Sequence, residues 1–243
     1  MKACVVIPAR FNSSRFPGKP IVKLNDKEMI LWVAENCAKA VDVKNVYIAT
    51  DDIRISKIVL RNGFQVIETP SNLLTGTDRV AEASKNLNYE IIVNVQGDEP
   101  LINPKDIDST VNFFIKNKFD IVVPHINIKL KNKSNIVKLL VNKKNKIMWM
   151  TRSDAPCFFK TSGKFLKKHL SIIVFNNDSL INYSKLKTSH FEKIESIELL
   201  RALENKFNMG SNQVKSNSFS IDVKDDFKKA KKFFKNDKIK YFY

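Results

Sequence analysis

The sequence predicts an α/β fold in which helices cover both faces of a mostly parallel sheet. Apolar segments of strand length alternate with longer segments of helical periodicity through residues 1–124. Polar side chains follow three of the predicted strands, at Arg10, Asp51 and Asp98. The carboxyl ends of parallel strands lie at one edge of a sheet, and ligands of such sheets bind there. We therefore expect these three side chains to lie near one binding site.

The elements of the first half follow one another in regular order. Predicted strands are residues 4–7, 46–49, 65–67, 91–95 and 121–123, and predicted helices are residues 28–40, 53–62, 78–87 and 104–115. The first helix places Ile30, Val33, Ala34 and Cys37 on one face, as an amphipathic helix does. Gly63 ends the second helix, and Pro104 begins the last one.

The pattern changes from about residue 127. Residues 137–141 and 147–150 are predicted to pair across a polar turn, and residues 172–175 to form a further strand. Residues 193–205 have the periodicity of one long helix, and residues 225–236 that of a basic terminal helix. Because no low-complexity linker or repeat divides the chain, we expect one domain spanning residues 1–243 with a strand-rich insertion.

The composition is that of a folded protein outside the membrane. The chain has 243 residues, of which 43% are hydrophobic and 28% charged, which is sufficient for a core. Its apolar stretches are too short to span a bilayer, and Arg10 interrupts the segment where a signal peptide would stay apolar. We expect a cytoplasmic protein that is not bound to a membrane.

The net charge of +17 suggests a nucleic-acid partner at first sight. Most of the basic residues are lysines, and they are scattered along the chain apart from the last 20 residues. We therefore expect no nucleic acid, and a field that attracts a small polyanion. A catalytically inactive nucleic-acid-binding protein stays the competing interpretation. Cys4, Cys37 and Cys157 have no metal-ligand spacing, and we expect them to be buried thiols.

Residues 5–20 read VVIPARFNSSRFPGKP and carry the strongest functional signal. A strand leads into a loop whose cations and hydroxyls are Arg10, Ser13, Arg15 and Lys19. Arginine offers a fork of donors and lysine a point charge, so the loop is suited to a polyphosphate. Gly18 allows the backbone to approach a ligand closely. The spacing is that of neither a Walker loop nor G-x-G-x-x-G, and an ordinary basic surface loop is the alternative.

Two aspartates are candidate Mg²⁺ ligands. Asp98 follows a buried strand in VNVQGDEP, and Asp222 lies in FSIDVKDD before the last helix. Mg²⁺ takes one or two protein carboxylates and completes its shell with water and phosphate oxygens, so this pair would suffice. The alternative for Asp222 is a turn or helix cap, which is also our prediction for Glu99 and Asp225.

The sequence TGTDR at residues 75–79 is predicted to open a helix at a nucleotide. Thr77 is the expected N-cap, and Asp78 is expected to orient Arg79. Further along, three glutamates share the predicted helix 193–205 or its start with Arg201; they are Glu192, Glu195 and Glu198. They indicate either a substrate site or a solvated charged face.

These residues belong to a longer ordered set. After the first loop come YIATDD, TGTDRVAEA and IVNVQGDEP, and then MTRSDAP, KKHLSIIVF, FEKIESIELLRALEN and SIDVKDDF. With them the whole chain resembles the 3-deoxy-manno-octulosonate (Kdo) cytidylyltransferases, also called CMP-Kdo synthetases. The related sialic-acid enzymes share the first loop but not the later motifs. The resemblance implies a three-layer nucleotide-diphospho-sugar transferase fold, Mg²⁺, a homodimer and a role in lipopolysaccharide or surface-glycan synthesis. It also implies that CTP and a 3-deoxy-2-ulosonic acid give a CMP-sugar and pyrophosphate.

Residue roles follow from the same resemblance. It implies a nucleotide-binding half at about residues 1–124 and a sugar-binding and dimerisation half at about 125–243. The CTP phosphates would contact Arg10, Ser13, Arg15 and Lys19, and the nucleotide pocket would include Thr77, Arg79 and Gln96. The sugar acid would contact Arg152, His169 and Glu198, and the metal would be held by Asp98 and Asp222. Arg15, Lys19 and these two aspartates would form the catalytic set, since the two basic side chains and the metal that the aspartates hold would neutralise the departing pyrophosphate.

The chain departs from the family pattern in its second half. The family usually has glycine and tyrosine where this chain has Ser171 and Ile173, glutamine at Leu199, glycine at Ser220 and threonine at Val223. Loss of polar partners alters selectivity between substrates that differ in a hydroxyl. The departures therefore indicate either an altered sugar acid, deoxygenated or amino-substituted, or neutral drift. A different nucleoside triphosphate is the remaining alternative.

Overall fold

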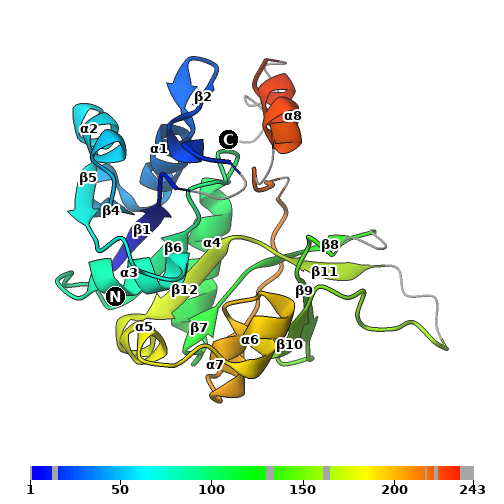
Figure 1. Ribbon diagram of the computed structural model, residues 1–243. Coiled ribbons are helices and arrows are strands. Elements are labelled where there is room, and N and C mark those ends of the chain that lie inside the picture. Colours follow the sequence, from blue (N-terminus) through cyan, green and yellow to red (C-terminus); the bar gives the residue numbers. More distant parts are fainter. Residues whose placement is uncertain are drawn as a thin grey trace.

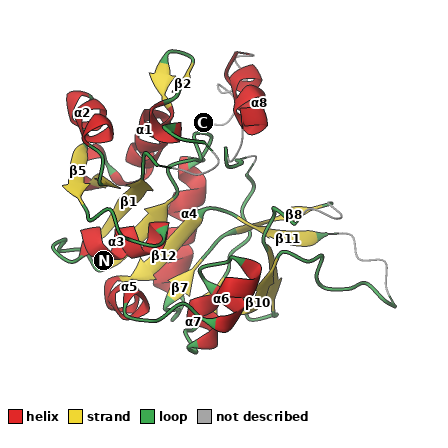
Figure 2. Cartoon of the chain, viewed as in Figure 1, coloured by secondary structure: helices red, strands yellow, loops and turns green. Residues whose placement is uncertain are grey.

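The computed structural model describes residues 2–12, 16–129, 134–160, 165–216, 218–221 and 224–235. A twisted central sheet runs through the molecule with helices on both faces, and a smaller sheet extends to one side (Figures 1 and 2). The architecture confirms the predicted α/β fold with a mostly parallel sheet and a strand-rich insertion.

The central sheet has seven strands among the described residues, in the order β13–β7–β12–β6–β1–β4–β5. Its strands are β1 (Ala3–Ala9), β4 (Val46–Thr50), β5 (Gln65–Glu68), β6 (Ile91–Val95), β7 (Ile121–Val122), β12 (Ile172–Asn176) and β13 (Met209–Gly210). β12 runs antiparallel to β6 and β7, and the other neighbouring pairs are parallel. The strand predicted at 172–175 thus belongs to the central sheet.

Alternation along the strands produces three layers. Val5 and Ile7 of β1 pack with α1 (Met29–Val41), α2 (Ile53–Arg61) and α4 (Pro104–Lys116). Cys4 and Val6 point to the other face and pack with α3 (Gly76–Ser84), α5 (Asn177–Ser184) and α7 (Leu200–Glu204). Because successive side chains of a strand face opposite sides, one apolar run serves both cores.

In its described residues, the insertion forms a four-stranded antiparallel sheet in the order β10–β9–β11–β8. Its strands are β8 (His125–Ile128), β9 (Lys138–Val141), β10 (Ile147–Thr151) and β11 (Leu166–His169). The predicted pairing of 137–141 with 147–150 is confirmed. Strands β8 and β11 were not predicted because histidine, asparagine and lysine interrupt their apolar pattern.

The single helix predicted at residues 193–205 is wrong. The chain forms α6 (His190–Glu195), breaks, and begins again at α7. Ser196 ends α6 in the left-handed conformation, with φ of 51°. The break therefore separates the glutamates that the helical spacing had placed on one face.

A third, smaller core joins the C-terminal helix to the first loop. α8 (Lys224–Lys235) lies beside the hairpin of β2 (Lys23–Leu24) and β3 (Lys27–Glu28) (Figure 1). Phe227 meets Phe16 edge to face, with ring centroids 5.9 Å apart, and Phe234 packs 4.7 Å from Trp32. The basic terminal helix was predicted, but its contact with the loop was not.

Two of the three cysteines are buried as predicted. Burial raises the pKa of the Cys4 thiol to about 12 and raises that of Cys37 as well, so both stay protonated. The prediction is wrong for Cys157, which is exposed. Within the described part of the chain, no helix is long and apolar enough to cross a bilayer.

Candidate active site

The loop after β1 closes on itself. The Gly18 amide donates to the Phe11 carbonyl at 2.9 Å, and Gly18 has φ of 71°. A Cβ there would lie 3.2 Å from the Phe11 ring, so both the conformation and the close approach favour glycine. The predicted phosphate-binding residues Ser13 and Arg15 lie outside the described residues.

A cavity of about 150 Å³, called here the first cavity, opens where β1 and β6 end. It is lined by Pro8, Ala9, Arg10, Lys19, Pro20, Leu73, Thr75, Gly76, Arg79, Gln96, Gly97 and Asp98. Five of the predicted nucleotide-site and metal-site residues are thus brought together, from segments far apart in the sequence. This is the edge of the sheet at which the sequence pattern predicted a site.

Lys19 connects three parts of this site. Its ammonium donates to Asp98 Oδ2 at 2.7 Å and to the Ile221 carbonyl at 2.9 Å. The Ile221 amide in turn donates to the Asp98 carbonyl at 2.9 Å. The loop, the end of β6 and the segment before α8 are therefore fixed to one another at the cavity. Asp222, the second predicted metal ligand, lies outside the described residues.

Asp98 has the chemistry of a Mg²⁺ ligand. Its side chain is 23% exposed at the cavity edge. Mg²⁺ is typically bound by one or two carboxylates together with the phosphate oxygens of the substrate. Among the described residues, no group of three or more His, Cys, Asp or Glu side chains is placed to hold a metal. Mg²⁺ does not require such a group, because nucleotide phosphates and water complete its shell.

Arg79 is held by a partner other than the predicted one. It is 3% exposed, and its Nη1 lies 3.2 Å from Asp51 Oδ1 and donates to Thr69 Oγ1 at 2.5 Å. Burial lowers the pKa of Arg79, whereas Asp51 raises it. The prediction that Asp78 orients Arg79 is wrong, because Asp51 at the end of β4 does so.

Thr75, and not Thr77, caps α3. Thr75 Oγ1 accepts from the Asp78 amide at 3.0 Å, and Asp78 accepts from the Thr75 amide at 3.2 Å, which is a capping box. Thr77 is instead fully buried and donates to Glu198 Oε1 at 2.7 Å. It also accepts from Asn94 Nδ2 at 3.0 Å. Asn94 was missed, although a polar residue inside the apolar strand IIVNV is a visible signal.

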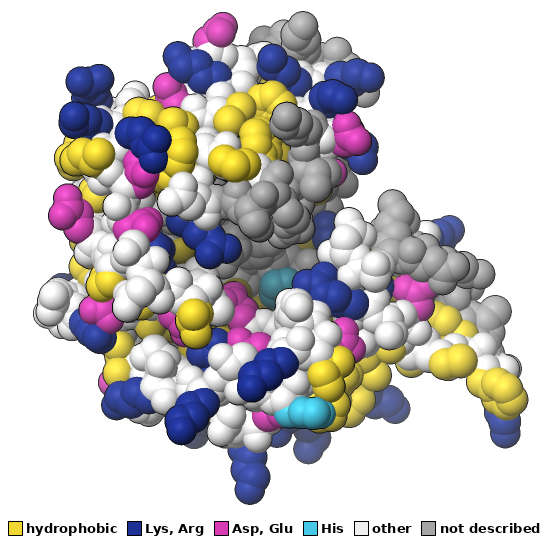
Figure 3. Space-filling model, in the orientation of Figure 1, with side chains coloured by type: hydrophobic (Ala, Val, Ile, Leu, Met, Phe, Trp, Pro, Cys, Tyr) yellow, Lys and Arg dark blue, Asp and Glu magenta, His cyan; other side chains and the backbone are white. Residues whose placement is uncertain are grey.

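A second cavity of about 640 Å³ adjoins the first. It is lined by Arg10, Leu74, Thr75, Gly76, Gln96, Val137, Met150, His169, Ile173, Thr188, Glu192, Lys193, Ser196, Ile197, Glu198 and Leu199. Arg10, Thr75, Gly76 and Gln96 line both cavities. In the space-filling view the molecule is hollowed on this face, with basic, acidic and histidine side chains around the hollow (Figure 3).

Two of the predicted sugar-contacting residues line this second cavity. Burial raises the pKa of Glu198, and hydrogen bonds from Thr77 and Thr75 oppose that rise. His169 has a buried Nε2 without a hydrogen-bond partner among the described residues. Burial lowers the pKa of His169 to about 4, so the ring is neutral at pH 7. A neutral imidazole nitrogen can accept a hydrogen bond from a ligand hydroxyl, but this nitrogen is buried, so a ligand would reach it only after a local rearrangement.

Arg152 lies beside the second cavity rather than in its lining. Its Nε donates to the Glu195 carbonyl at 2.7 Å, and its Nη2 donates to the Ser196 carbonyl at 3.0 Å. The Glu195 carboxylate accepts from Thr151 Oγ1 and from the Arg152 amide. Arg152 therefore fixes the break after α6 in this structure.

The three glutamates are not a solvated face. Glu192 is 6% exposed and pairs with Arg201, and Glu198 accepts from Thr77. Glu99 was predicted as a turn or cap residue, and its backbone does lie in two turns, since its amide donates to the Gln96 carbonyl and its carbonyl accepts from the Ile102 amide. The prediction missed the role of its side chain. It is 3% exposed and accepts from the hydroxyls of Ser218 and Ser220, which ties down the segment before α8. No local pattern could have shown these pairings, because more than 100 residues separate the partners of Glu99 and of Glu198.

Of the four family departures described by the structure, two line the second cavity. Ile173 and Leu199 are 2% and 1% exposed and contribute apolar wall. Ser171 does not line this cavity. Its hydroxyl lies 3.4 Å from the Ser220 hydroxyl, and its carbonyl accepts from the backbone amide of Gln96.

A three-layer fold with two adjoining cavities at the ends of its parallel strands is the arrangement that the resemblance to nucleotidyltransferases of the nucleotide-diphospho-sugar transferase fold leads one to expect. The family model for cytidylyltransferases matches residues 4–215. The chain is 37% identical to the 3-deoxy-manno-octulosonate cytidylyltransferase of Leptospira interrogans, over 93% of this chain and 96% of that protein. The chain belongs to the cytidylyltransferase family.

Two further relatives extend the comparison. The chain is 34% identical to the 8-amino-3,8-dideoxy-manno-octulosonate cytidylyltransferase of Shewanella sp. strain W3-18-1, over 95% of this chain and 97% of that one. The structure of the present chain matches that of CMP:2-keto-3-deoxy-manno-octonic acid synthetase complexed with CTP, with a TM-score of 0.91 and 30% identity. That match covers 97% of this chain and 99% of the other.

Proposed function

We propose that this protein activates Kdo, or a close analogue, by transferring the CMP group of CTP to it with release of pyrophosphate. The observation that carries the proposal is the pair of adjoining cavities that share Arg10, Thr75, Gly76 and Gln96. A reaction between a nucleotide and a sugar acid requires two sites that meet, so that the reacting atoms can come into contact. The names of the relatives support this pair of substrates.

In the proposed reaction the anomeric hydroxyl oxygen of the sugar bonds to the α-phosphorus of CTP. The bond from that phosphorus to the bridging oxygen breaks, so that pyrophosphate leaves with the bonding electron pair, and the hydroxyl proton passes to solvent. Lys19 and Arg15 neutralise the charge that develops on pyrophosphate, with Arg10 and Ser13 on the other phosphate oxygens. Mg²⁺, held by Asp98 and Asp222, would neutralise phosphate charge and favour ionisation of the sugar hydroxyl.

The remaining roles divide between the two cavities. Thr77, Arg79 and Gln96 would shape the nucleotide side, although Thr77 reaches it only through its contacts within the protein. His169 and Glu198 would receive sugar hydroxyls in the second cavity. Arg152 would contact the sugar acid only if its guanidinium left the carbonyls that it now binds.

The direct test is pyrophosphate release from CTP with Mg²⁺ and Kdo, compared with the other three nucleoside triphosphates. No release with CTP and any sugar acid would refute the proposal. Lys19→Met should lower kcat/KM for CTP by at least ~100-fold, the usual loss for a donor to developing charge. Lys57→Met, at an exposed lysine on α2, is the matched control and should retain wild-type kinetics. Wild-type kinetics in Lys19→Met would exclude Lys19 from the reaction.

A second candidate substrate is a sugar acid that lacks a hydroxyl or carries an amino group. The apolar side chains of Ile173 and Leu199 in the second cavity favour it, and a relative named for an 8-amino sugar supports it. A panel of Kdo, its 8-amino-8-deoxy analogue and deoxygenated analogues separates the candidates. Faster turnover of Kdo than of every analogue would indicate that the departures from the family pattern are neutral drift.

Three finer statements belong to the same proposal. We propose a homodimer, a cytoplasmic location and a role in lipopolysaccharide or surface-glycan synthesis, all on the family resemblance. The mass of the purified protein in solution tests the first: a mass near 28 kDa would indicate a monomer, since one chain is 27.9 kDa.

A further inference from the structure

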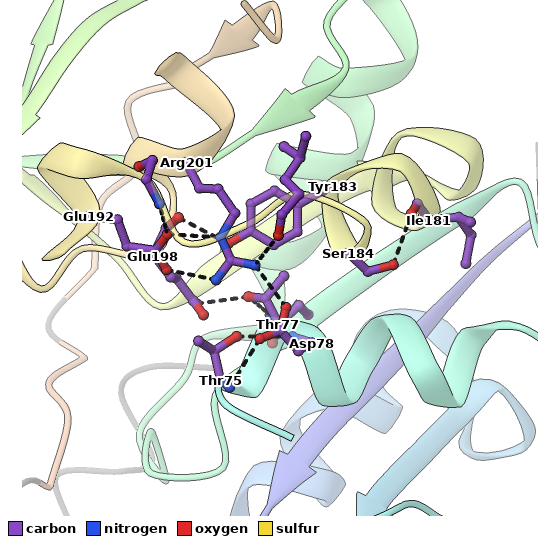
Figure 4. A network of polar contacts seen from close by, with 12 residues as sticks. Thr75, Thr77, Asp78, Ile181, Tyr183, Ser184, Glu192, Glu198 and Arg201 are labelled. Carbon is purple, nitrogen blue, oxygen red and sulfur yellow. Dashed lines mark hydrogen bonds and ion pairs between the residues drawn. The ribbon is translucent and has the colours of Figure 1, made fainter. Parts of the chain in front are cut away.

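Arg201 is buried in a polar network between α3 and the segment that contains α6 and α7 (Figure 4). It is 3% exposed and lines neither cavity. Its Nε and Nη2 donate to the two oxygens of Glu192 at 2.9 and 2.7 Å, and its Nη1 donates to Asp78 Oδ1 at 3.1 Å. Its guanidinium lies 4.8 Å from the Tyr183 ring centroid. One side chain thus joins two carboxylates that are far apart in the sequence.

Both carboxylates also serve as helix caps. Asp78 is the third residue of α3 and accepts from the amide of Thr75, the N-cap residue. Glu192 is the third residue of α6 and accepts from the amide of Ser189, its N-cap residue, at 3.1 Å. Because each carboxylate closes a capping box, its position is fixed relative to the start of its helix. Arg201 therefore connects the starts of two helices.

The starts of these helices form part of the second cavity wall. Thr75 and Gly76 contribute from α3, and Glu192 contributes from α6. Glu198, between α6 and α7, reaches across to α3 through Thr77 Oγ1 at 2.7 Å. Its carbonyl accepts from the Tyr183 hydroxyl at 2.9 Å, and that tyrosine ring lies against the Arg201 guanidinium.

We propose that Arg201 is a positioning residue that fixes the α6–α7 side of the second cavity to the start of α3, and so holds Glu198 in place for the sugar acid. The proposal rests on the function proposed above. The two sides differ in what else holds them. α3 keeps its own capping box and packs Val80 and Ala81 into the core, whereas α6 is a six-residue helix. Loss of the connection should therefore displace α6 and its glutamates more than α3.

Arginine geometry is essential to the proposal. The guanidinium uses three nitrogens in a fixed plane to reach two carboxylates, whereas a lysine ammonium is a single point charge. Arg201→Lys keeps the charge and loses the simultaneous contacts. If Arg201 served only to neutralise Glu192 and Asp78, lysine would suffice.

The test is steady-state pyrophosphate release by the Mg²⁺-loaded protein, with Kdo and CTP varied in turn. Arg201→Lys should raise KM for Kdo at least ~10-fold while KM for CTP stays within about twofold, since small displacements near a reacting group have large effects. Arg61→Lys, at an exposed arginine on α2, is the matched control. An unchanged KM for Kdo in Arg201→Lys would overturn the proposal.

A second variant covers the case in which Arg201→Lys does not fold. Asp78→Asn keeps an oxygen for the Thr75 amide, loses the ion pair with Arg201, and lies outside both cavity linings. It should raise KM for Kdo in the same direction and by a smaller factor. An unchanged KM in this variant would then count against the proposal.

Amide hydrogen exchange separates this proposal from the proposed function. In Arg201→Lys, exchange across residues 190–199 should accelerate at least ~10-fold, with α3 within about twofold of wild type. Absence of turnover by the wild type would refute the proposed function, and the exchange result would still decide the role of Arg201. Equal acceleration in both segments, or in neither, would overturn it.

Discussion

His125 should make the stability of the protein depend on pH where the insertion joins the central sheet. It is 3% exposed, and its Nε2 lies 3.0 Å from the Lys167 ammonium. Because lysine only donates, Nε2 must accept, and the ring proton lies on Nδ1, 2.6 Å from Ser211 Oγ. Protonation of Nε2 would break one hydrogen bond and place two cations side by side. Burial first, and Lys167 second, lower the pKa of His125 to about 4.

The free energy of unfolding follows from this shift. Between the unfolded pKa of 6.5 and the folded pKa of about 4, the unfolded chain binds the proton and the folded one does not. Stability is therefore full above pH 6.5 and falls as the pH decreases. The loss from His125 is about 2 kcal/mol between pH 7 and pH 5, and about 3 kcal/mol by pH 4.

Urea unfolding at pH 7 and pH 5 measures this contribution. In His125→Gln, the decrease in unfolding free energy between the two pH values should be about 2 kcal/mol smaller than in the wild type, since glutamine does not titrate. His190→Gln, at an exposed histidine on α6, is the control and should keep the wild-type pH dependence. If His125→Gln showed the wild-type decrease, the reasoning about the buried neutral ring would be refuted.

Two further substitutions test packing and polar pairing. Thr77→Val keeps the shape of the side chain and removes the hydroxyl between Asn94 and Glu198. The free energy of unfolding, measured in urea, should fall by about 1–3 kcal/mol. A smaller loss would mean that water replaces the hydroxyl. Gly210→Ala would place a Cβ 2.6 Å from Phe119 Cε2. This overpacking at β13 should lower the free energy of unfolding by about 1–3 kcal/mol. An unchanged free energy of unfolding would show that the Phe119 ring moves freely.

The sequence was sufficient to predict the edge of the sheet at which the first cavity lies. The prediction succeeded because parallel strands bring their carboxyl ends together whatever the intervening helices contain. Arg10, Asp51 and Asp98 follow β1, β4 and β6, and Arg79 meets Asp51 beside the first cavity. The places of Arg10, Asp51 and Asp98 depend on strand order alone, so a pattern of residues can reveal them, whereas the pairing of Arg79 with Asp51 was not predicted.

The second cavity could not be predicted in the same way. Its wall depends on the break between α6 and α7 at Ser196, where a non-glycine residue adopts φ of 51° inside a helical pattern. It depends also on pairs such as Thr77 with Glu198, which are separated by 121 residues. The helical periodicity of the sequence predicts that Glu192, Glu195 and Glu198 share one helix face. It does so because periodicity contains no information about the break at Ser196 or about pairs that are distant in sequence. Tertiary contacts override local propensity at this point.

The junction between the two cavities explains why a glycine follows the N-cap of α3. Gly76 lines both cavities, and a Cβ on it would lie 3.1 Å from Gln96 Oε1 and 3.4 Å from Pro8 Cγ. The side chain of Gln96 is itself held in place, because its Nε2 donates to Asn94 Oδ1 at 3.3 Å. The backbone amide of Gln96 donates to the Ser171 carbonyl at 3.2 Å. A side chain at residue 76 would therefore press on a glutamine that has little freedom to move. Two ligands that must react with each other have to meet where their compartments join, and the absence of a side chain at Gly76 leaves room at that junction.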